Sequence, residues 1–276
     1  MIVVIHSYKG GTGKTLISAN LATLFAIKGN TTCLLDMDFR APSLNSLFKT
    51  DQPKYWLNDY LNGACEPEEI LQNYCSEELD KERLFVCLAN LSTEAIREMT
   101  SKNRKWEMQA LSKLLSLKDS LVNRLGFDTL VIDTSPGIQY SSLNAIVAAD
   151  IALVVTTLET SDLEGTKRML HDLYQNFEKK TAVIVNKVPF DLLQSQRTEK
   201  VQTDLAQLGL VSNEVIACSC DIPLSENPCF FACRKRHHQF SRTLEKIVRE
   251  LPSVKRNDCS STDPDMPCFS LLTVPK

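Results

Sequence analysis

A glycine-rich segment with two lysines, Lys9–Thr15 (KGGTGKT), is the part of the sequence with the clearest chemical capability. It follows the apolar run Ile2–His6 and precedes a segment whose apolar residues fall at helical spacing. Glycines let a chain fold around phosphate oxygens with its N–H groups pointing inward, and the positive end of the next helix favours the same anions. We therefore predict a phosphate-binding loop, with Lys14 on the β- and γ-phosphates and the Thr15 hydroxyl on Mg²⁺. The other residues expected around the phosphates are Gly10, Gly11, Thr12 and Gly13.

The loop departs from the usual phosphate-loop pattern at one position. That pattern places a glycine five residues before Gly13, and Tyr8 stands there instead. A glycine-rich turn without a ligand is the alternative interpretation. Average residue usage makes seven matched positions rare by chance in a chain of this size, which favours nucleotide binding.

Two acidic residues follow the next strand-like run, Thr32–Leu35. Asp36 and Asp38 are two positions apart, so alternation along a strand places both side chains on one face. They would lie at the carboxyl edge of a sheet, where open α/β sheets bind ligands. Both carboxylates could then approach a metal ion and the γ-phosphate, although a simple acidic turn is the alternative.

Three further motifs follow in the chain. Asp133 ends the apolar run Asp128–Asp133 and is followed by Thr134-Ser-Pro-Gly137; Asn186 ends the run Ala182–Val185. The dipeptide Ile222-Pro223 comes later. Each motif alone is weak evidence for a nucleotide site. Their order after the phosphate loop makes them stronger evidence together.

With Lys9 two residues ahead of Gly11, the loop resembles the deviant Walker A loop of the MinD/ParA family of P-loop ATPases. This resemblance implies an ATP-dependent homodimer with nucleotide held between the subunits. It implies that Lys9 reaches the nucleotide of the partner subunit and neutralises phosphate charge. It also implies that Asp38 lies in the first switch and orients the attacking water. ATP and Mg²⁺ would be the cofactors, and hydrolysis would be slow.

The same resemblance assigns roles to the later motifs. Asp133 matches the Walker B position that holds Mg²⁺ through water, and the N–H of Gly137 would lie near the γ-phosphate. Asn186 would contact the adenine, and Pro223 would lie over it. Ser135 replaces the first proline of the family's D-T-P-P-G motif, which we expect to loosen this second switch slightly. The metal-site residues would be Thr15, Asp36 and Asp133.

Apolar strand-like runs alternate with helical patterns along the chain, which predicts an α/β fold with a doubly wound, mostly parallel sheet flanked by helices. Beyond the runs already named, we expect strands at Leu84–Leu88, Ile151–Val155 and Glu214–Ala217. Helical patterns cover 162–177, 194–209 and 237–250, and 41–126 is mixed and largely helical. We expect one ATPase domain over residues 1–251. Residues 252–276 are rich in proline without periodicity and predict a disordered tail.

Composition narrows the class of protein. The 276 residues are 43% hydrophobic and 24% charged, with net charge −3, which excludes fibrous and disordered proteins. The balanced charge argues against wrapping of nucleic acid over the whole surface. No apolar run is long enough to span a bilayer. Because a strand-like run begins at Ile2, we expect no signal peptide, a cytoplasmic location and reduced cysteines.

What the switch serves is left open among three interpretations. The first is spatial positioning or partition. The tail does not form the basic amphipathic membrane-targeting helix of MinD-like proteins, because it contains Pro264, Pro267 and Pro275. Non-specific DNA binding, as in ParA-like proteins, could use a basic segment, although such segments are usually solvated helix faces. Its residues are Arg234, Lys235, Arg236, His237, His238, Arg242, Lys246 and Arg249.

The second interpretation is an ATP-driven carrier of metal ions or iron–sulfur clusters. Its ligands would be Cys218, Cys220, Cys229 and Cys233 near His237, but the spacing is not that of a structural zinc site, and ordinary thiols are the alternative. The third interpretation is a regulatory switch that docks a protein activator or adaptor without DNA or membrane.

Overall fold

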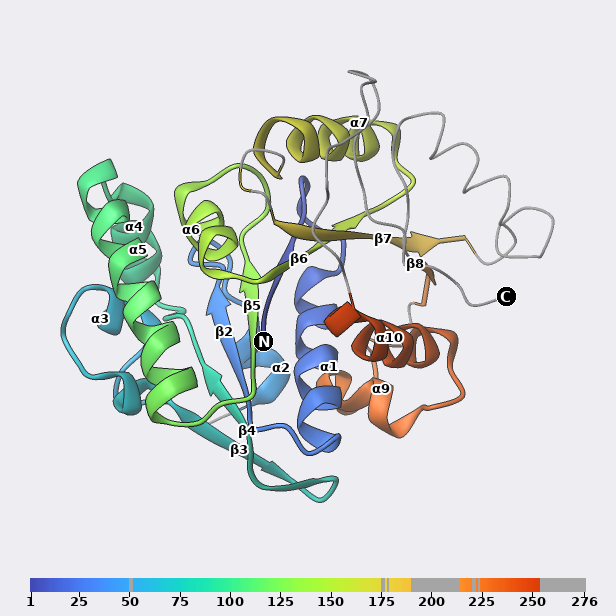
Figure 1. The fold of residues 1–276 in the computed structure, drawn as a ribbon, viewed down its shortest axis with the longest axis horizontal. Helices are drawn as coiled ribbons and strands as arrows, with labels where there is room; N and C mark the ends of the chain where they lie inside the picture. The colour runs from blue at the N-terminus through green and yellow to red at the C-terminus, as the bar shows by residue number, and fades with distance from the viewer. Residues whose placement is uncertain are drawn as a thin grey trace.

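One mostly parallel sheet runs through the part of the chain that the computed structural model describes (Figure 1). The described residues are 1–49, 52–174, 177, 179–189, 214–219, 222 and 224–253. Within them, eight strands lie in the order β3-β4-β2-β5-β1-β6-β7-β8. Every neighbouring pair is parallel except β3 with β4. The strands are β1 (Ile2–His6), β2 (Thr32–Met37), β3 (Gln72–Ser76), β4 (Leu79–Cys87), β5 (Thr129–Thr134), β6 (Ile151–Thr156), β7 (Lys180–Val188) and β8 (Glu214–Ala217).

Helices cover both faces of the sheet (Figure 1). One face carries α1 (Lys14–Ile27), α2 (Leu44–Phe48), α9 (Phe231–Arg234) and α10 (Gln239–Glu250). The other carries α3 (Leu57–Leu61), α4 (Thr93–Ser101), α5 (Arg104–Asp119), α6 (Tyr140–Ala148) and α7 (Thr160–Met169). Short 3₁₀ turns lie at η1 (Pro67–Ile70), η5 (Pro228–Phe230) and η6 (Leu251–Ser253), and π-helical turns at η2 (Ser120–Arg124) and η3 (Leu170–Tyr174).

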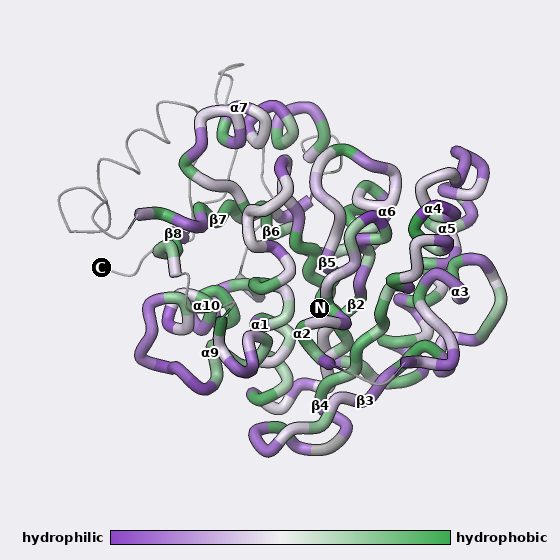
Figure 2. The backbone as a smooth tube through the Cα atoms, turned by 180° about the vertical axis from the view of Figure 1, so that it is seen from behind, coloured by the Kyte–Doolittle hydropathy of each residue, from purple (hydrophilic) through white to green (hydrophobic). Residues whose placement is uncertain are grey.

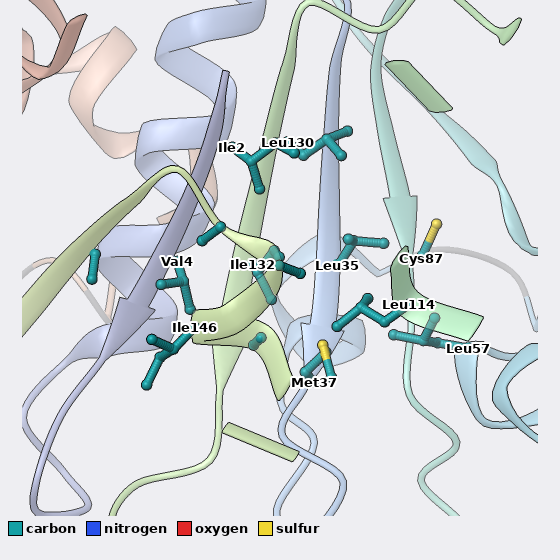
Figure 3. Packing of buried hydrophobic residues seen from close by; sticks show 14 of the residues in the cluster. Ile2, Val4, Leu35, Met37, Leu57, Cys87, Leu114, Leu130, Ile132 and Ile146 are labelled. Carbon is teal, nitrogen blue, oxygen red and sulfur yellow. The ribbon is translucent and has the colours of Figure 1, made fainter. Parts of the chain in front are cut away.

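Alternation along the strands builds a separate core on each face. In β1, Ile2 and Val4 point into the core beneath α5, α6 and α7, where Figure 3 shows them packed with residues of the neighbouring strands and helices. Val3 and Ile5 point into the core beneath α1 and α10. Because both faces are buried, the central strands are largely hydrophobic, with polar residues toward their carboxyl ends, as the hydropathy colours of Figure 2 show. The alternation places the His6 side chain on the same face of the sheet as Ile2 and Val4.

The predicted fold class is confirmed, and the structure adds an element that the sequence did not suggest. Residues 72–87 form an antiparallel hairpin of β3 and β4, and the strand expected at Leu84–Leu88 is only its final part. The helical pattern expected over 162–177 divides into α7 and the π turn η3. The helix expected at 194–209 and the tail from residue 254 lie outside the described residues.

Among the described residues, no helix combines the length and the apolar character that crossing a bilayer requires.

Candidate active site

The predicted phosphate loop connects the end of β1 to the start of α1, on the edge of the sheet where the parallel strands end. Gly11 and Gly13 have φ angles of 76° and 93°, the left-handed region that glycine adopts without strain. A Cβ atom on Gly13 would lie only 2.5 Å from the side-chain nitrogen of Asn186. Glycine is therefore required at position 13 for its backbone angle and for the close approach of Asn186.

Asn186 lies near the end of β7 and is buried against the loop. Its Nδ2 donates a hydrogen bond of 2.7 Å to the carbonyl oxygen of Thr12. The side chain therefore supports the phosphate loop, a contact that the sequence did not indicate. The adenine contact of Asn186 stays a prediction, and Pro223 lies outside the described residues.

Two buried carboxylates lie side by side beneath the loop. Asp36 at the end of β2 is in register with Asp133 on β5. The Ser18 hydroxyl of α1 donates to Asp133 Oδ1 at 2.9 Å, and the Thr15 hydroxyl also bonds this carboxylate. The Oδ2 atoms of both aspartates are buried without a hydrogen-bond partner. Paired carboxylate oxygens beside a threonine hydroxyl are the donors that Mg²⁺ prefers, so these residues fit that ion.

The electrostatics of this pair also fit a cation. Burial raises the pKa of Asp36 well above its usual value, and the neighbouring Asp133 raises it further. Burial raises the pKa of Asp133 to about 6, although Thr15 and Lys14 oppose this shift. The Lys14 ammonium is itself buried, which lowers its pKa despite the attraction of Asp133 and Asp38. The carboxylates carry a desolvation cost that a bound cation would offset.

Replacing one of these carboxylates should stabilise the protein in the absence of nucleotide. Because the folded state disfavours ionised Asp133, the cost is fully present above pH 6 and diminishes as the pH falls towards the unfolded pKa of 3.8. We expect Asp133→Asn to raise the free energy of unfolding by up to about 3 kcal/mol at pH 7.5. At pH 5 the gain should be about 1 kcal/mol smaller, because wild-type Asp133 is then largely protonated.

Urea unfolding of nucleotide-free protein at the two pH values measures this effect. The matched control is Asp80→Asn, which removes an exposed carboxylate of β4 and should leave stability nearly unchanged at both pH values. If Asp133→Asn lowers stability at pH 7.5, the carboxylate is compensated in the fold and this description of the site is wrong.

Asp38 is held in the same site by Ser135 and by the residues that follow Asp38 itself. The Ser135 hydroxyl donates to Asp38 Oδ1 at 2.8 Å, and the backbone N–H groups of Arg40 and Ala41 contact the same oxygen. Ser142 Oγ in turn donates to the carbonyl oxygen of Ser135 at 2.8 Å. The Ser135 hydroxyl thus connects the segment Thr134–Gly137 to Asp38, a contact that a proline could not make, while a looser segment stays a prediction.

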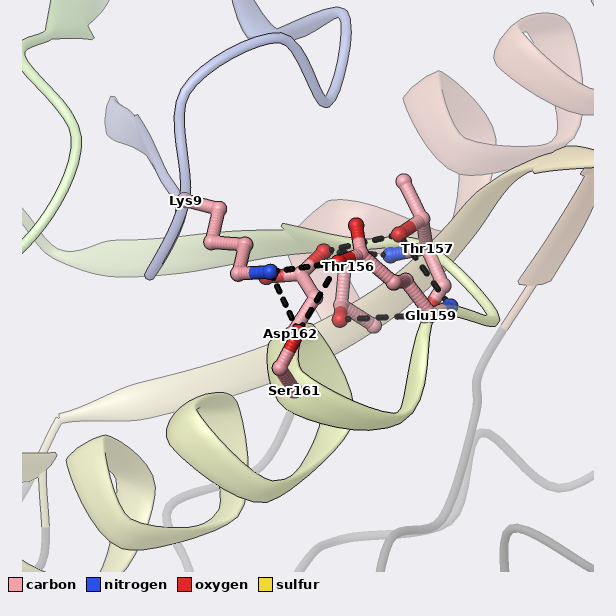
Figure 4. Close-up of polar contacts among 6 residues, drawn as sticks. All are labelled: Lys9, Thr156, Thr157, Glu159, Ser161 and Asp162. Atoms are coloured by element: carbon pink, nitrogen blue, oxygen red, sulfur yellow. Dashed lines mark hydrogen bonds and ion pairs between the residues drawn. The ribbon is translucent and has the colours of Figure 1, made fainter.

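Lys9 contacts the start of α7 within its own chain, as Figure 4 shows. Its Nζ forms an ion pair of 2.6 Å with Glu159 and also donates to the Ser161 hydroxyl. The Lys9 and Glu159 side chains are 33% and 64% exposed, so water screens this ion pair. Nearby, Asp162 is fully buried, and only one of its carboxylate oxygens is hydrogen-bonded, to Thr157.

Gly137 lies against the residues that lead into the phosphate loop. Its φ angle is 77°, and its N–H donates to the Ser7 carbonyl oxygen at 2.9 Å. His6 contacts its carbonyl oxygen at 2.9 Å. Sequence reasoning treated His6 only as the end of a strand and missed Ser18 and Asp162. Of these, only Ser18 had a signal, since it lies one helical turn after Lys14.

The cysteines do not form a common site in the described part of the chain. Cys229 is buried, with its thiol directed to Asn227, and Cys233 packs near Thr23 of α1. Cys218 is exposed, and Cys220 lies outside the described residues. Among the described residues, no three His, Cys, Asp or Glu side chains are grouped as metal ligands.

The basic segment is partly neutralised. Arg234 pairs with Glu78 of the β3–β4 hairpin at 2.7 Å, and Lys246 pairs with Glu214 of β8 at 2.5 Å. His238 accepts from the Phe240 N–H and caps α10. The exposed basic side chains of α10 that remain are Arg242 and Arg249.

Comparison with known proteins agrees with this geometry. A family model described as an AAA domain matches residues 1–186. The septum site-determining protein MinD of Thermotoga maritima is 30% identical over 256 residues, covering 91% of this chain and 87% of that protein. Structures of the cell division ATPase MinD of Pyrococcus furiosus and of MinD of Pyrococcus horikoshii with Mg-ADP each superpose with a TM-score of 0.70 at 23% identity. They cover 92% and 91% of this chain, and 99% and 95% of their own. The chain belongs to the MinD/ParA family of P-loop ATPases.

Proposed function

We propose that the chain binds Mg-ATP in the loop Lys9–Thr15, dimerises around the nucleotide and hydrolyses it slowly, as a switch for spatial positioning or partition. The observation that carries this proposal is the buried pair Asp36 and Asp133, whose unpartnered oxygens lie beneath a glycine-rich loop. The loop supplies backbone donors for phosphate, and the pair supplies ligands for the metal.

Each residue of the site has a task in this proposal. Lys14 binds the β- and γ-phosphates, and the Thr15 hydroxyl, Asp36 and Asp133 hold the metal, which neutralises phosphate charge when bound. Asp38 orients the attacking water, and Ser135 fixes the direction of its carboxylate. No group needs to abstract a proton in advance, because phosphoryl transfer depends mainly on positioning and charge.

Dimerisation requires Lys9 to leave its partner within the chain. The exposed ion pair with Glu159 contributes little free energy, so a nucleotide phosphate of the partner subunit can replace Glu159. A phosphate offers more charge and more acceptors than one carboxylate. The contact with Glu159 and Ser161 is thus the resting position of Lys9 in the monomer.

Removing the Lys9 ammonium should separate nucleotide binding from dimerisation. We expect Lys9→Ala to bind ATP within about threefold of wild-type affinity, because in the monomer its charge is directed to α7. The ATP-dependent dimer should weaken by about tenfold or more. Each subunit loses one Lys9 ammonium, so the dimer loses two charge-assisted contacts to phosphate. Light scattering with ATP and Mg²⁺ measures the dimer, and calorimetry measures nucleotide affinity.

Glu159→Gln is the matched variant, because it removes the resting partner and leaves Lys9 in place. Its dimer should be as stable as that of wild type or more stable. A Lys9→Ala protein that dimerises with ATP as wild type does would contradict the proposed role of Lys9.

Spatial positioning or partition is the use that the comparisons support best, because the Thermotoga relative is named a septum site-determining protein. The function as a carrier of metal ions or iron–sulfur clusters is not favoured. Cys229 belongs to the hydrophobic core that contains residues of α1 and of the β3–β4 hairpin, and Cys233 packs against that core. Binding of DNA through α10, docking of a protein adaptor and a cytoplasmic location stay predictions. Salt-sensitive co-sedimentation with DNA in the presence of ATP tests the first of these.

A further inference from the structure

A buried chain of hydrogen bonds connects the π turn η3 to the second switch. Tyr174 Oη lies 2.7 Å from His6 Nδ1, and His6 Nε2 lies 2.9 Å from the carbonyl oxygen of Gly137. The His6 ring is fully buried, and the Tyr174 side chain is 3% exposed. Neither residue has a role in the nucleotide site described above, although the hydrogen bonds that connect them end at Gly137.

The acceptor at one end fixes the direction of the whole chain. A carbonyl oxygen can only accept, so Nε2 of His6 carries the proton and donates to Gly137. Nδ1 then has a free lone pair and accepts from the Tyr174 hydroxyl. Burial lowers the pKa of His6 to about 4, with Lys14 acting in the same direction, so the ring is neutral near pH 7. Tyr174 therefore stabilises the same tautomer that the contact with Gly137 requires.

Gly137 is held on both sides, by the last residue of β1 and by the residue after it. Its N–H donates to the Ser7 carbonyl oxygen, and its own carbonyl oxygen accepts from His6. A second, longer bond to that oxygen, 3.2 Å, comes from the Gln139 N–H. In this conformation the Gly137 N–H points to Ser7 and is occupied. To bind a γ-phosphate, it must leave Ser7.

We propose that His6, oriented by Tyr174, is a positioning residue that holds Gly137 in the resting conformation of the second switch. The proposal rests on the proposed function, together with the contact between the Gly137 N–H and the γ-phosphate that the resemblance to MinD/ParA ATPases implies. ATP must displace Gly137 from this conformation, whereas ADP, which lacks the γ-phosphate, need not. His6 and Tyr174 therefore reduce the preference of the protein for ATP over ADP and keep the switch at rest until the γ-phosphate arrives.

The test is the ratio of affinities for a non-hydrolysable ATP analogue and for ADP, each with Mg²⁺, measured by calorimetry. The variants are Tyr174→Phe, which leaves the ring volume intact but frees the tautomer, and His6→Leu, which removes the donor. His6→Leu loses the hydrogen bond to Gly137 in the resting state, which should raise affinity for the analogue by about three- to tenfold. Tyr174→Phe only weakens that bond and should give a smaller gain in the same direction. Affinity for ADP should change less than twofold.

Two further variants separate positioning from a general loss of stability. Tyr60→Phe removes another tyrosine hydroxyl, which donates to the carbonyl oxygen of Lys113 outside the nucleotide site, and should leave the ratio unchanged. His6→Gln keeps an N–H donor without a tautomer, so its ratio should stay near wild type and become insensitive to Tyr174→Phe.

A selective gain for the analogue in Tyr174→Phe and His6→Leu, with rescue by His6→Gln, supports the proposal. Equal losses for both nucleotides, an unchanged ratio or a selective loss for the analogue overturns it, even if wild type binds both nucleotides as the proposed function requires. If wild type binds neither nucleotide, the proposed function fails and this inference fails with it.

Discussion

Lys14→Ala is expected to lower the affinity for ATP by at least about 100-fold. The Lys14 ammonium is the buried cation at the first position of α1, beneath the phosphate loop. Its charge faces Asp133, Asp38 and Asp162, so its removal leaves carboxylates directed at a site that must accept phosphate. The variant loses the charge-assisted contact between Lys14 and phosphate, and the remaining carboxylates repel the phosphate. Both effects lower the affinity for ATP. Calorimetric titration with Mg-ATP measures the loss.

Lys28→Ala is the matched control for this variant. Lys28 lies exposed at the other end of α1, and its loss changes the net charge of the protein by the same amount. It should bind ATP as wild type does. Unchanged ATP affinity in Lys14→Ala would show that the loop does not bind the phosphates.

Asp38→Ala is expected to lower the rate of ATP hydrolysis by about 100-fold or more while ATP still binds. The carboxylate is almost fully buried and fixed by three donors to one oxygen, and such a group can orient a water molecule without reorganising. Since Lys14 and the metal-site residues remain, the variant should accumulate as an ATP-bound dimer. Single-turnover hydrolysis and light scattering measure the two effects.

Ser135→Ala provides the graded companion to this prediction. It removes one of the donors to Asp38 and leaves the carboxylate, so hydrolysis should fall by about three- to tenfold. A protein with Asp38→Ala that hydrolyses ATP at the wild-type rate would exclude Asp38 from positioning water.

The sequence predicted the sheet well because buried parallel strands are continuous apolar runs. Ile2–His6, Asp128–Asp133 and Ile151–Val155 coincide with β1, β5 and β6 within about one residue. The strand β3 escaped prediction because Gln72–Ser76 alternates between half-buried and exposed positions at the sheet edge and contains only Tyr74 and Cys75 as apolar residues. Edge strands carry a weaker hydrophobic pattern than central ones.

The sequence indicated those residues of the candidate site that lie in the phosphate loop or at the end of a strand. Asp36 and Asp133 come together because their strands are neighbours in register, which their positions at strand ends had indicated. The contacts of Asn186 with Thr12, and of His6 with Tyr174, join residues 174 and 168 positions apart. No local spacing encodes such pairs, because they depend on how β7 and the α7–η3 segment pack around β1.

The departure of the loop at Tyr8 also has a structural explanation that spacing could not give. The Tyr8 ring lies against α7 at Gly165, where an added Cβ would come within 2.0 Å of the ring. The bulky residue in the loop is therefore matched by a glycine in the helix that Lys9 also contacts. The phosphate loop and α7 are packed together through both residues.

The measurement that tests the central claim most directly is the mass of the wild-type protein in solution with Mg²⁺ and either ADP or a non-hydrolysable ATP analogue. We predict a mass of 31.0 kDa, that of one chain, with ADP and twice that mass with the analogue. Calorimetry on the same samples confirms that both nucleotides are bound. The same mass in both states, with nucleotide bound, would contradict an ATP-dependent dimer.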